Sequence, residues 1–107
     1  MALYADDQAS RERLVAGMRQ LVNSGMSSGA SGNVSVRTEH GMLVTPTGIV
    51  PKDLLPEHIV CMQLDGEVAK GQLIPSSEWH MHADIYRSKP TLQAIVHCHS
   101  AYATILA

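Results

Sequence analysis

The stretch GNVSVRTEHGMLVT, residues 32–45, decides the fold of this 107-residue chain. Val34 and Val36 alternate with polar residues, which is the pattern of a strand with one buried face. Glu39 to Gly41 form a turn signal, and apolar residues return at 42–44, so the stretch predicts a β-hairpin. Because a hairpin pairs its strands in opposite directions, we expect an antiparallel sheet.

Further elements are predicted on both sides of this hairpin. Before it, apolar residues recur at positions 14, 15, 18, 21 and 22, which predicts an amphipathic helix over 7–24. Asp6 or Asp7 is expected to cap this helix and Gly25 to end it. After the hairpin, the sequence predicts a strand over 58–64, a turn at Asp65–Gly66, a short strand over 67–69, a helix from Ser76 to about Ser88, and a strand over 92–98. The pattern favours one domain with a largely antiparallel sheet covered by helices.

Composition narrows the class of protein. An apolar fraction of 45% and a charged fraction of 17% are typical of a globular chain. The net charge of −2 and the scattered basic residues argue against a nucleic-acid partner. No apolar run approaches the ~20 residues that span a bilayer, and Asp6 and Asp7 stand where a signal peptide would carry bases. We therefore expect no membrane partner and a cytoplasmic location.

The last residues, Ser100–Ala107, have the pattern of a helix that begins but has no C-terminal cap. A complete domain rarely stops inside an apolar helical turn, so the sequence is interpreted as a fragment or a truncated product.

Six histidines are many for this length, and two of them form the pair His97-Cys98-His99 at the end of an apolar strand. Side chains two residues apart on a strand point to the same face, so two imidazoles can converge on one zinc ion. The same alternation sends Cys98 to the opposite face. Two ordinary hydrogen-bonded histidines are the alternative interpretation of the pair.

A second pair, His80 and His82, lies on the predicted helix, where residues two apart point about 200° apart and do not share a metal. Glu78 and His82 do share a helical face, because they are four residues apart. That couple is either a competing metal or hydrogen-bonding pair or, more simply, a surface contact.

Three short segments combine small residues with hydrogen-bond donors. Ser76-Ser77-Glu78 begins a helix, where free backbone N–H groups and the helix dipole favour an anion. The segments 31–33 and 45–48 contain glycine beside Asn or Thr at strand ends. Taken alone, the first is an ordinary helix start and the other two are turns. None is a nucleotide-binding glycine loop.

In order and spacing, these motifs together resemble the class II aldolase/adducin family. The motifs are GNVSVR at 32–37, TPTGI at 45–49, PSSEW at 75–79 and VHCH at 96–99. The resemblance covers nearly the whole chain but only about the first half of the family's domain. Residues 1–107 are therefore expected to form the N-terminal part of a single domain. The fold it implies is an α/β/α sandwich around a mainly antiparallel sheet.

The resemblance also implies roles for particular residues. It assigns the substrate phosphate to Gly32, Asn33, Thr47, Gly48, Ser76 and Ser77. It assigns Glu78 as catalytic acid/base and metal contact, and His97 and His99 as ligands of Zn²⁺. The implied activity is zinc-dependent cleavage of a ketose 1-phosphate, such as L-fuculose 1-phosphate, to dihydroxyacetone phosphate and an aldehyde. The implied partners are the phosphorylated sugar and further copies of the chain in a homotetramer. The family's third zinc histidine has no counterpart among these 107 residues.

Two alternatives stay open. One is a sugar-phosphate 4-epimerase or dehydratase of the same family, which would reuse the phosphate segments and the metal. The other is an adducin-like structural module that binds no metal. Retention of Glu78, His97 and His99 together favours an enzyme, because a structural module has no physical need for all three.

Overall fold

The structure, a computed structural model, describes residues 2–25 and 32–98. Its helices are α1 (Gln8–Asn23) and α2 (Trp79–Ser88), and its strands are β1 (Asn33–Thr38), β2 (Gly41–Val44), β3 (Val60–Met62) and β4 (Ala94–His97). Two short 3₁₀ segments, η1 (Pro51–Asp53) and η2 (Pro56–His58), connect β2 to β3. The helix predicted for Ser100–Ala107 lies outside the described residues.

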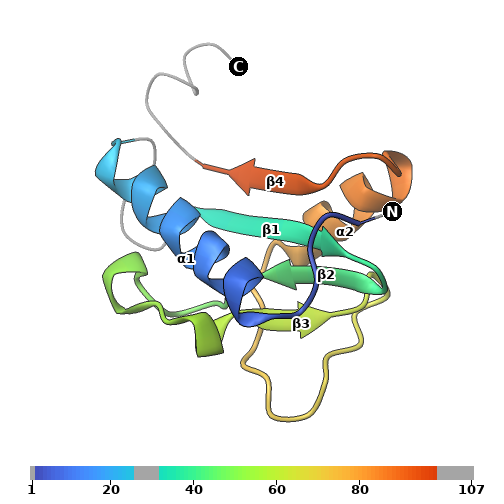
Figure 1. The fold of residues 1–107 in the computed structure, drawn as a ribbon, viewed down its shortest axis with the longest axis horizontal. Coiled ribbons are helices and arrows are strands. Elements are labelled where there is room, and N and C mark those ends of the chain that lie inside the picture. Colours follow the sequence, from blue (N-terminus) through green and yellow to red (C-terminus); the bar gives the residue numbers. More distant parts are fainter. Residues whose placement is uncertain (1, 26–31, 99–107) are drawn as a thin grey trace.

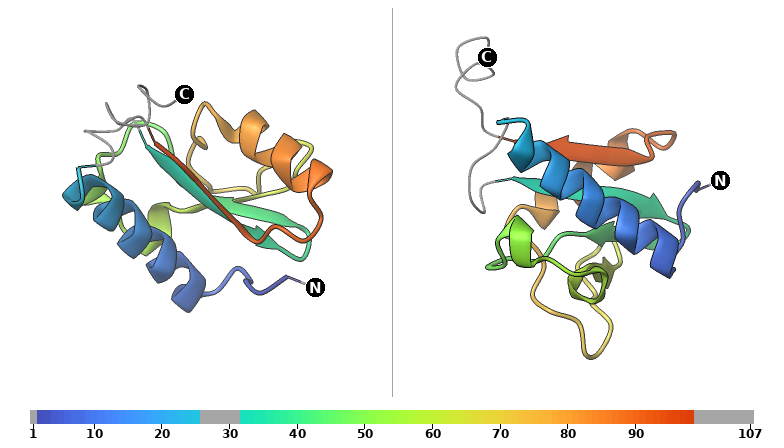
Figure 2. Two further views of the ribbon diagram at one scale, coloured as in Figure 1. Left: turned by 90° about the horizontal axis from the view of Figure 1, so that it is seen from above. Right: turned by 60° about the vertical axis from the view of Figure 1, so that its left-hand side comes forward.

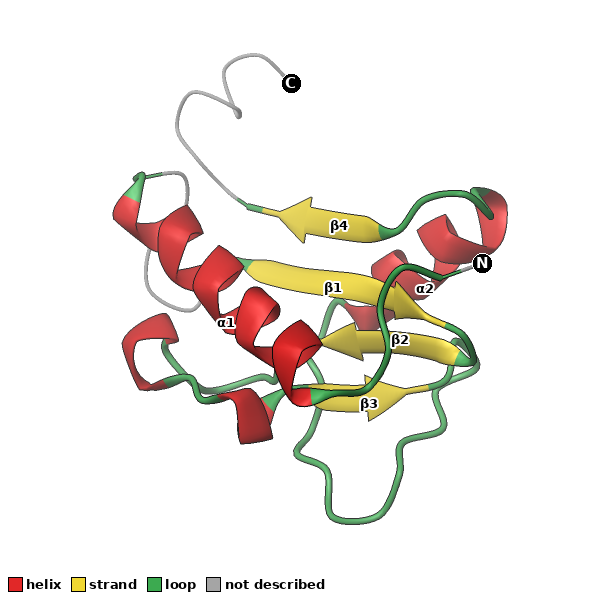
Figure 3. Ribbon diagram, viewed as in Figure 1, coloured by secondary structure: helices red, strands yellow, loops and turns green. Residues whose placement is uncertain are grey.

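The four strands form one sheet in the order β3-β2-β1-β4, and each neighbouring pair is antiparallel. Helix α1 lies on one face of the sheet and α2 on the other, as Figures 1 and 2 show. Figure 3 separates the helices of the two outer layers from the strands between them. The predicted hairpin, the antiparallel sheet and the α/β/α layering are therefore confirmed.

Alternation along β1 divides its side chains between the two layers. Val34 and Val36 are buried with Leu43 of β2 against Leu14 and Met18 of α1. The intervening residues of β1 point to the α2 side, where Met42 and Val44 of β2 also pack. The α1 side is thus an apolar core, whereas the α2 side combines apolar side chains with polar ones from β1.

Helix α1 begins and ends as its sequence predicts. The Asp7 carboxylate accepts a hydrogen bond from the backbone N–H of Ser10 at 2.8 Å, and this bond lowers the pKa of Asp7. Gly25 follows the last turn with a φ of +78°, a conformation that glycine adopts without steric cost. Arg11 and Arg19 donate to backbone carbonyls of the η1–β3 connection, so both guanidinium groups hold that segment against α1.

The predictions between residues 58 and 69 were partly wrong. The strand expected over 58–64 is only Val60–Met62, because η2 occupies the positions before it. The strand expected over 67–69 is reduced to a single bridge between Met62 and Val68. The Asp65–Gly66 turn does form; Gly66 has a φ of +102°, and a Cβ at this position would clash with the Trp79 ring. Beyond Val68 the residues are exposed up to a second turn, so no apolar face remains to hold them in the sheet.

Among the helices of residues 2–25 and 32–98, none combines the length and the apolar composition needed to cross a bilayer.

Candidate active site

Three segments that are far apart in the sequence are joined by backbone hydrogen bonds at one end of the sheet. The start of β1 meets the residues after β2, because Thr45 N–H donates to the carbonyl of Val34 at 3.1 Å. The residues before α2 join them, because Ser76 N–H donates to the carbonyl of Thr45 at 2.9 Å and Thr47 N–H to that of Ile74 at 3.0 Å. In Figure 1 this end of the sheet is on the left, where β1 begins and β2 and β4 end. The bonds fix the three segments as one unit.

This unit contains all six residues to which the family resemblance assigns the substrate phosphate. Gly32, Asn33 and Ser76 are buried within it, whereas Thr47, Gly48 and Ser77 are exposed. Gly48 has a φ of +78°, so the turn after Thr47 uses a conformation that favours glycine. The structure therefore brings the three segments together, each with a buried or an exposed donor.

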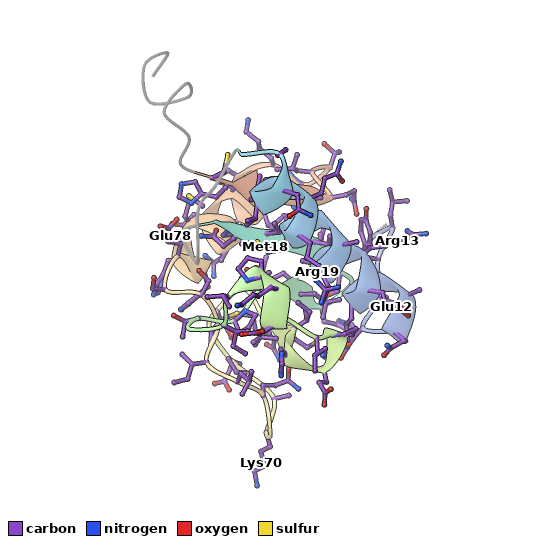
Figure 4. All side chains as sticks on the ribbon, turned by 90° about the vertical axis from the view of Figure 1, so that its left-hand side faces the viewer. Glu12, Arg13, Met18, Arg19, Lys70 and Glu78 are labelled. Atoms are coloured by element: carbon purple, nitrogen blue, oxygen red, sulfur yellow. The ribbon has the colours of Figure 1, made fainter. Side chains whose placement is uncertain are left out.

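Glu78 and His97 meet beside this unit. Glu78 is the N-terminal cap position of α2, yet its carboxylate makes no capping bond. The Glu78 carboxylate lies in ion-pair contact with Nδ1 of His97, which stands opposite Asn33 in the β1–β4 register. The His97 and Glu78 side chains are 26% and 36% exposed, so both are within reach of a ligand. Figure 4 faces this end of the molecule and shows Glu78 at its edge, far from Lys70 at the tip of the 65–74 loop.

The pair supplies two of the donor types that zinc prefers, an imidazole and a carboxylate. The third predicted zinc ligand, His99, lies outside the described residues. Within the part of the chain that the structure describes, no group of three His, Cys, Asp or Glu side chains is placed to hold a metal. Cys98 packs against the apolar cluster beneath α1, on the opposite face from His97, as alternation predicted. The donors present therefore fit a zinc ion that takes further ligands from elsewhere.

A buried polar network that sequence reasoning missed lies directly behind Asn33. His82 of α2 is 0% exposed, and both of its ring nitrogens are hydrogen-bonded. Nε2 lies 2.5 Å from Oδ1 of Asn33, and Nδ1 lies 2.6 Å from Oγ of Ser35. Ser35 Oγ is also 2.7 Å from the hydroxyl of Tyr86. The four side chains form one chain of hydrogen bonds between β1 and α2.

The four-residue spacing of Glu78 and His82 had suggested a direct couple or a surface contact, and neither is found. His82 faces β1 and is fully buried, while the Glu78 carboxylate turns to His97. His80, by contrast, is exposed and stacks on Trp79. The prediction that His80 and His82 diverge is confirmed. The only sequence signal for the hydrogen-bond network was the presence of two hydroxyl groups, one from a serine of β1 and one from a tyrosine of α2.

The pKa of His82 is lowered to about 4, chiefly by burial. Charge repulsion from His97 contributes to this lowering, whereas Glu78 opposes it. The ring is therefore neutral at physiological pH, and one of its nitrogens donates while the other accepts.

This shift predicts a loss of stability in acid. With a pKa near 6.5 in the unfolded chain and about 4 in the folded one, His82 binds its proton more readily when unfolded. The free energy of unfolding should therefore fall as the pH drops from about 6.5 to about 4, by at most about 3 kcal/mol. Denaturant titrations at several pH values measure it.

Replacing His82 with Gln gives the control, because glutamine does not titrate. The pH dependence between 4 and 6.5 should become flatter in this variant. Asp6 and Asp7 have pKa values below their ordinary value of 3.8, so their titration changes the stability only below the pH range from 4 to 6.5. An unchanged slope in the variant would show that another group causes the acid loss.

Comparison with known proteins agrees with the fold and the motifs. Residues 12–107 match the model of the family described as the Class II Aldolase and Adducin N-terminal domain. The chain is 41% identical over 99 residues to the 5-methylthioribulose-1-phosphate/5-deoxyribulose-1-phosphate aldolase of Rhodospirillum rubrum, covering 92% of this chain and 44% of that protein. It is 44% identical over 85 residues to the L-fuculose phosphate aldolase of Escherichia coli K12, covering 79% of this chain and 39% of that one.

Solved structures give the same result. An L-fuculose 1-phosphate aldolase superposes with a TM-score of 0.84 at 36% identity, covering 90% of this chain and 46% of its own. YgbL of Klebsiella pneumoniae, titled a putative aldolase/epimerase/decarboxylase, superposes with a TM-score of 0.86 at 34% identity, covering 96% and 49%. The chain belongs to the class II aldolase and adducin family. It spans less than half the length of the curated relatives named above.

Proposed function

We propose that this chain carries the phosphate-binding and proton-transferring part of a zinc-dependent aldolase that cleaves a ketose 1-phosphate. The observation that carries the proposal is the meeting of three donor-rich segments beside the Glu78–His97 contact. The aldolases similar to this chain are named for different sugars, and those named above all act on a ketose phosphate. The phosphate that these substrate names share defines the substrate class better than any one sugar.

The three segments would hold the phosphate. Asn33, Ser76 and Thr47 supply side-chain donors, and the start of α2 adds the positive end of the helix dipole. Holding the phosphate fixes the position of the reacting carbons, so that binding energy far from the broken bond contributes to the rate.

Glu78 would move the proton. Cleavage of a ketose 1-phosphate breaks the bond between C3 and C4, and C3 must then gain a proton to become the hydroxymethyl group of dihydroxyacetone phosphate. In the reverse direction the same carbon loses it. A partly exposed carboxylate that is free of a capping bond is suited to both transfers.

Glu78, His97 and His99 would hold the zinc ion. When bound, zinc supplies a Lewis acid that stabilises negative charge on the substrate oxygens during cleavage. An assay that couples release of dihydroxyacetone phosphate to its reduction, run on L-fuculose 1-phosphate and 5-deoxy-D-ribulose 1-phosphate, tests the proposal in the full-length protein. No cleavage of either sugar, with epimerisation or dehydration instead, would favour the other enzymes of the family. A protein without zinc would favour the structural module.

Ser77 provides a prediction for the phosphate site. Replacing Ser77 with Ala should raise KM for the ketose 1-phosphate about 10-fold and change kcat less, because a hydrogen bond to a charged group contributes about 1.5–3 kcal/mol. Ser88→Ala is the matched control, since Ser88 is an exposed serine at the other end of α2. Equal KM values in the two variants would contradict the phosphate assignment of Ser77, and so would a phosphate-bound structure with the anion distant from all three segments.

A further inference from the structure

In the hydrogen-bond network behind Asn33, the donor and the acceptor of each bond can be assigned by following the hydrogens. Tyr86 is buried, and its hydroxyl can donate to Ser35 Oγ. Ser35 then donates to Nδ1 of His82, which leaves the imidazole proton on Nε2, facing Oδ1 of Asn33. In this arrangement each hydrogen has one acceptor. The reverse arrangement would direct the Tyr86 hydroxyl hydrogen away from Ser35, its hydrogen-bond partner within the described residues.

This assignment fixes how the Asn33 amide is turned. An asparagine side chain has an oxygen that accepts and a nitrogen that donates, and only a 180° flip exchanges them. Because the His82 Nε2–H group occupies Oδ1, the two N–H donors of Asn33 are directed away from His82. Asn33 begins β1 and pairs with His97, so its amide lies at the same end of the sheet as Thr45, Ser76 and Glu78.

The orientation matters for an anion. An amide nitrogen stabilises a phosphate oxygen, whereas an amide oxygen in the same place repels it. Asn33 has no titratable group of its own, and nothing local to the β1 start distinguishes its two ends by size. The bond from His82 is therefore the feature that selects the donating end.

We propose that His82 is a positioning residue of the phosphate site: through its Nε2–H bond it holds the Asn33 amide with both donors toward the phosphate, and Ser35 and Tyr86 hold His82 in the tautomer that makes this possible. The inference rests on the proposed function of Asn33 as a phosphate ligand. The neutral state of His82 agrees with this positioning role, because a pKa of about 4 keeps the ring uncharged at physiological pH.

Two isosteric substitutions separate the two bonds of His82. The side-chain nitrogen of Gln lies where Nε2 lies, so His82→Gln keeps the donor to Asn33. The polar end of Asn lies where Nδ1 lies, so His82→Asn keeps the bond to Ser35 and releases Asn33. A purely structural role predicts that both variants suffer alike. A positioning role predicts that only His82→Asn weakens the phosphate site.

The experiment measures binding of inorganic phosphate by calorimetry to the full-length protein and its variants. We expect the Kd to rise about 10-fold in His82→Asn and to stay within about threefold of the parent in His82→Gln. Asn33→Ala should also lose about 10-fold, and adding His82→Asn to Asn33→Ala should cause no further loss, because His82 acts through Asn33. Equal losses in the two His82 variants, or additive losses in the double variant, would overturn the inference.

A second measurement covers the case in which a variant does not fold. In the ¹⁵N spectrum of the folded parent, labelled at histidine, His82 should carry its proton on Nε2 and show no titration between pH 5 and 8. A proton on Nδ1 would overturn the inference without any substitution. If the parent binds no phosphate, the proposed function itself fails, and the inference fails with it. If the parent and Asn33→Ala behave as expected but His82→Asn binds like the parent, only the inference fails.

Discussion

Replacing Glu78 with Gln should lower the rate of aldol cleavage at least ~10²-fold, while the melting temperature stays close to that of the parent. Zinc should stay bound, because Gln keeps a side-chain oxygen at the same place and both histidine ligands remain. General acid–base assistance typically contributes ~10²–10⁴-fold, and an amide of nearly the same shape does not carry the proton. The structural contribution of Glu78 is small by comparison. As an acid at the start of α2 it contributes only ~0.3–1 kcal/mol through the dipole, and its side chain makes no capping bond.

Steady-state kinetics, thermal melting and elemental analysis of the full-length protein provide the three readouts. Glu67→Gln is the matched control, because Glu67 is an exposed glutamate that follows Met62 at the end of the sheet where β2 begins, whereas Glu78 lies at the end where β2 ends. A cleavage rate near that of the parent in Glu78→Gln would mean that another group moves the proton. Unfolding of the variant would instead show that the contact between Glu78 and His97 stabilises the start of α2.

Replacing His97 with Ala should remove most of the zinc, and His99→Ala should do the same. Loss of a group that merely orients a metal ligand weakens binding about 10–100-fold, so loss of a ligand itself should weaken it at least as much. The structure supports the expectation for His97, whose ring lies against the Glu78 carboxylate on the α2 side of the sheet. Elemental analysis of the purified full-length protein measures the change.

Two controls accompany this prediction. Cys98→Ser should leave the zinc content unchanged, because Cys98 packs toward the cluster beneath α1. His80→Ala should also leave it unchanged, because His80 is exposed and stacked on Trp79. Zinc content in His97→Ala equal to that of the parent would refute the metal assignment, and loss in Cys98→Ser would mean that the strand alternates in the opposite sense.

The local elements could be predicted because their signals are local. The hairpin follows from the Val34–Val36 alternation and the turn before Met42, and α1 follows from its apolar spacing and its Asp7 cap. The prediction failed at 67–69, where a strand depends on a neighbour to pair with. After the single bridge from Val68 to Met62 the chain has no apolar face to bury, so propensity alone overestimated the strand.

The features of the candidate site can also be divided into those that the local sequence determines and those that depend on packing. Sequence by itself determined which residue types stand at the strand ends and at the start of α2, and alternation determined that Cys98 and His97 face opposite layers. Only the tertiary structure decided that His82 is buried with its ring bonded to Asn33 and Ser35. Helical spacing tells which residues share a face of α2, but not which strand that face meets. That choice is made when α2 packs on the polar side of β1, because a buried imidazole must find a partner for each nitrogen there.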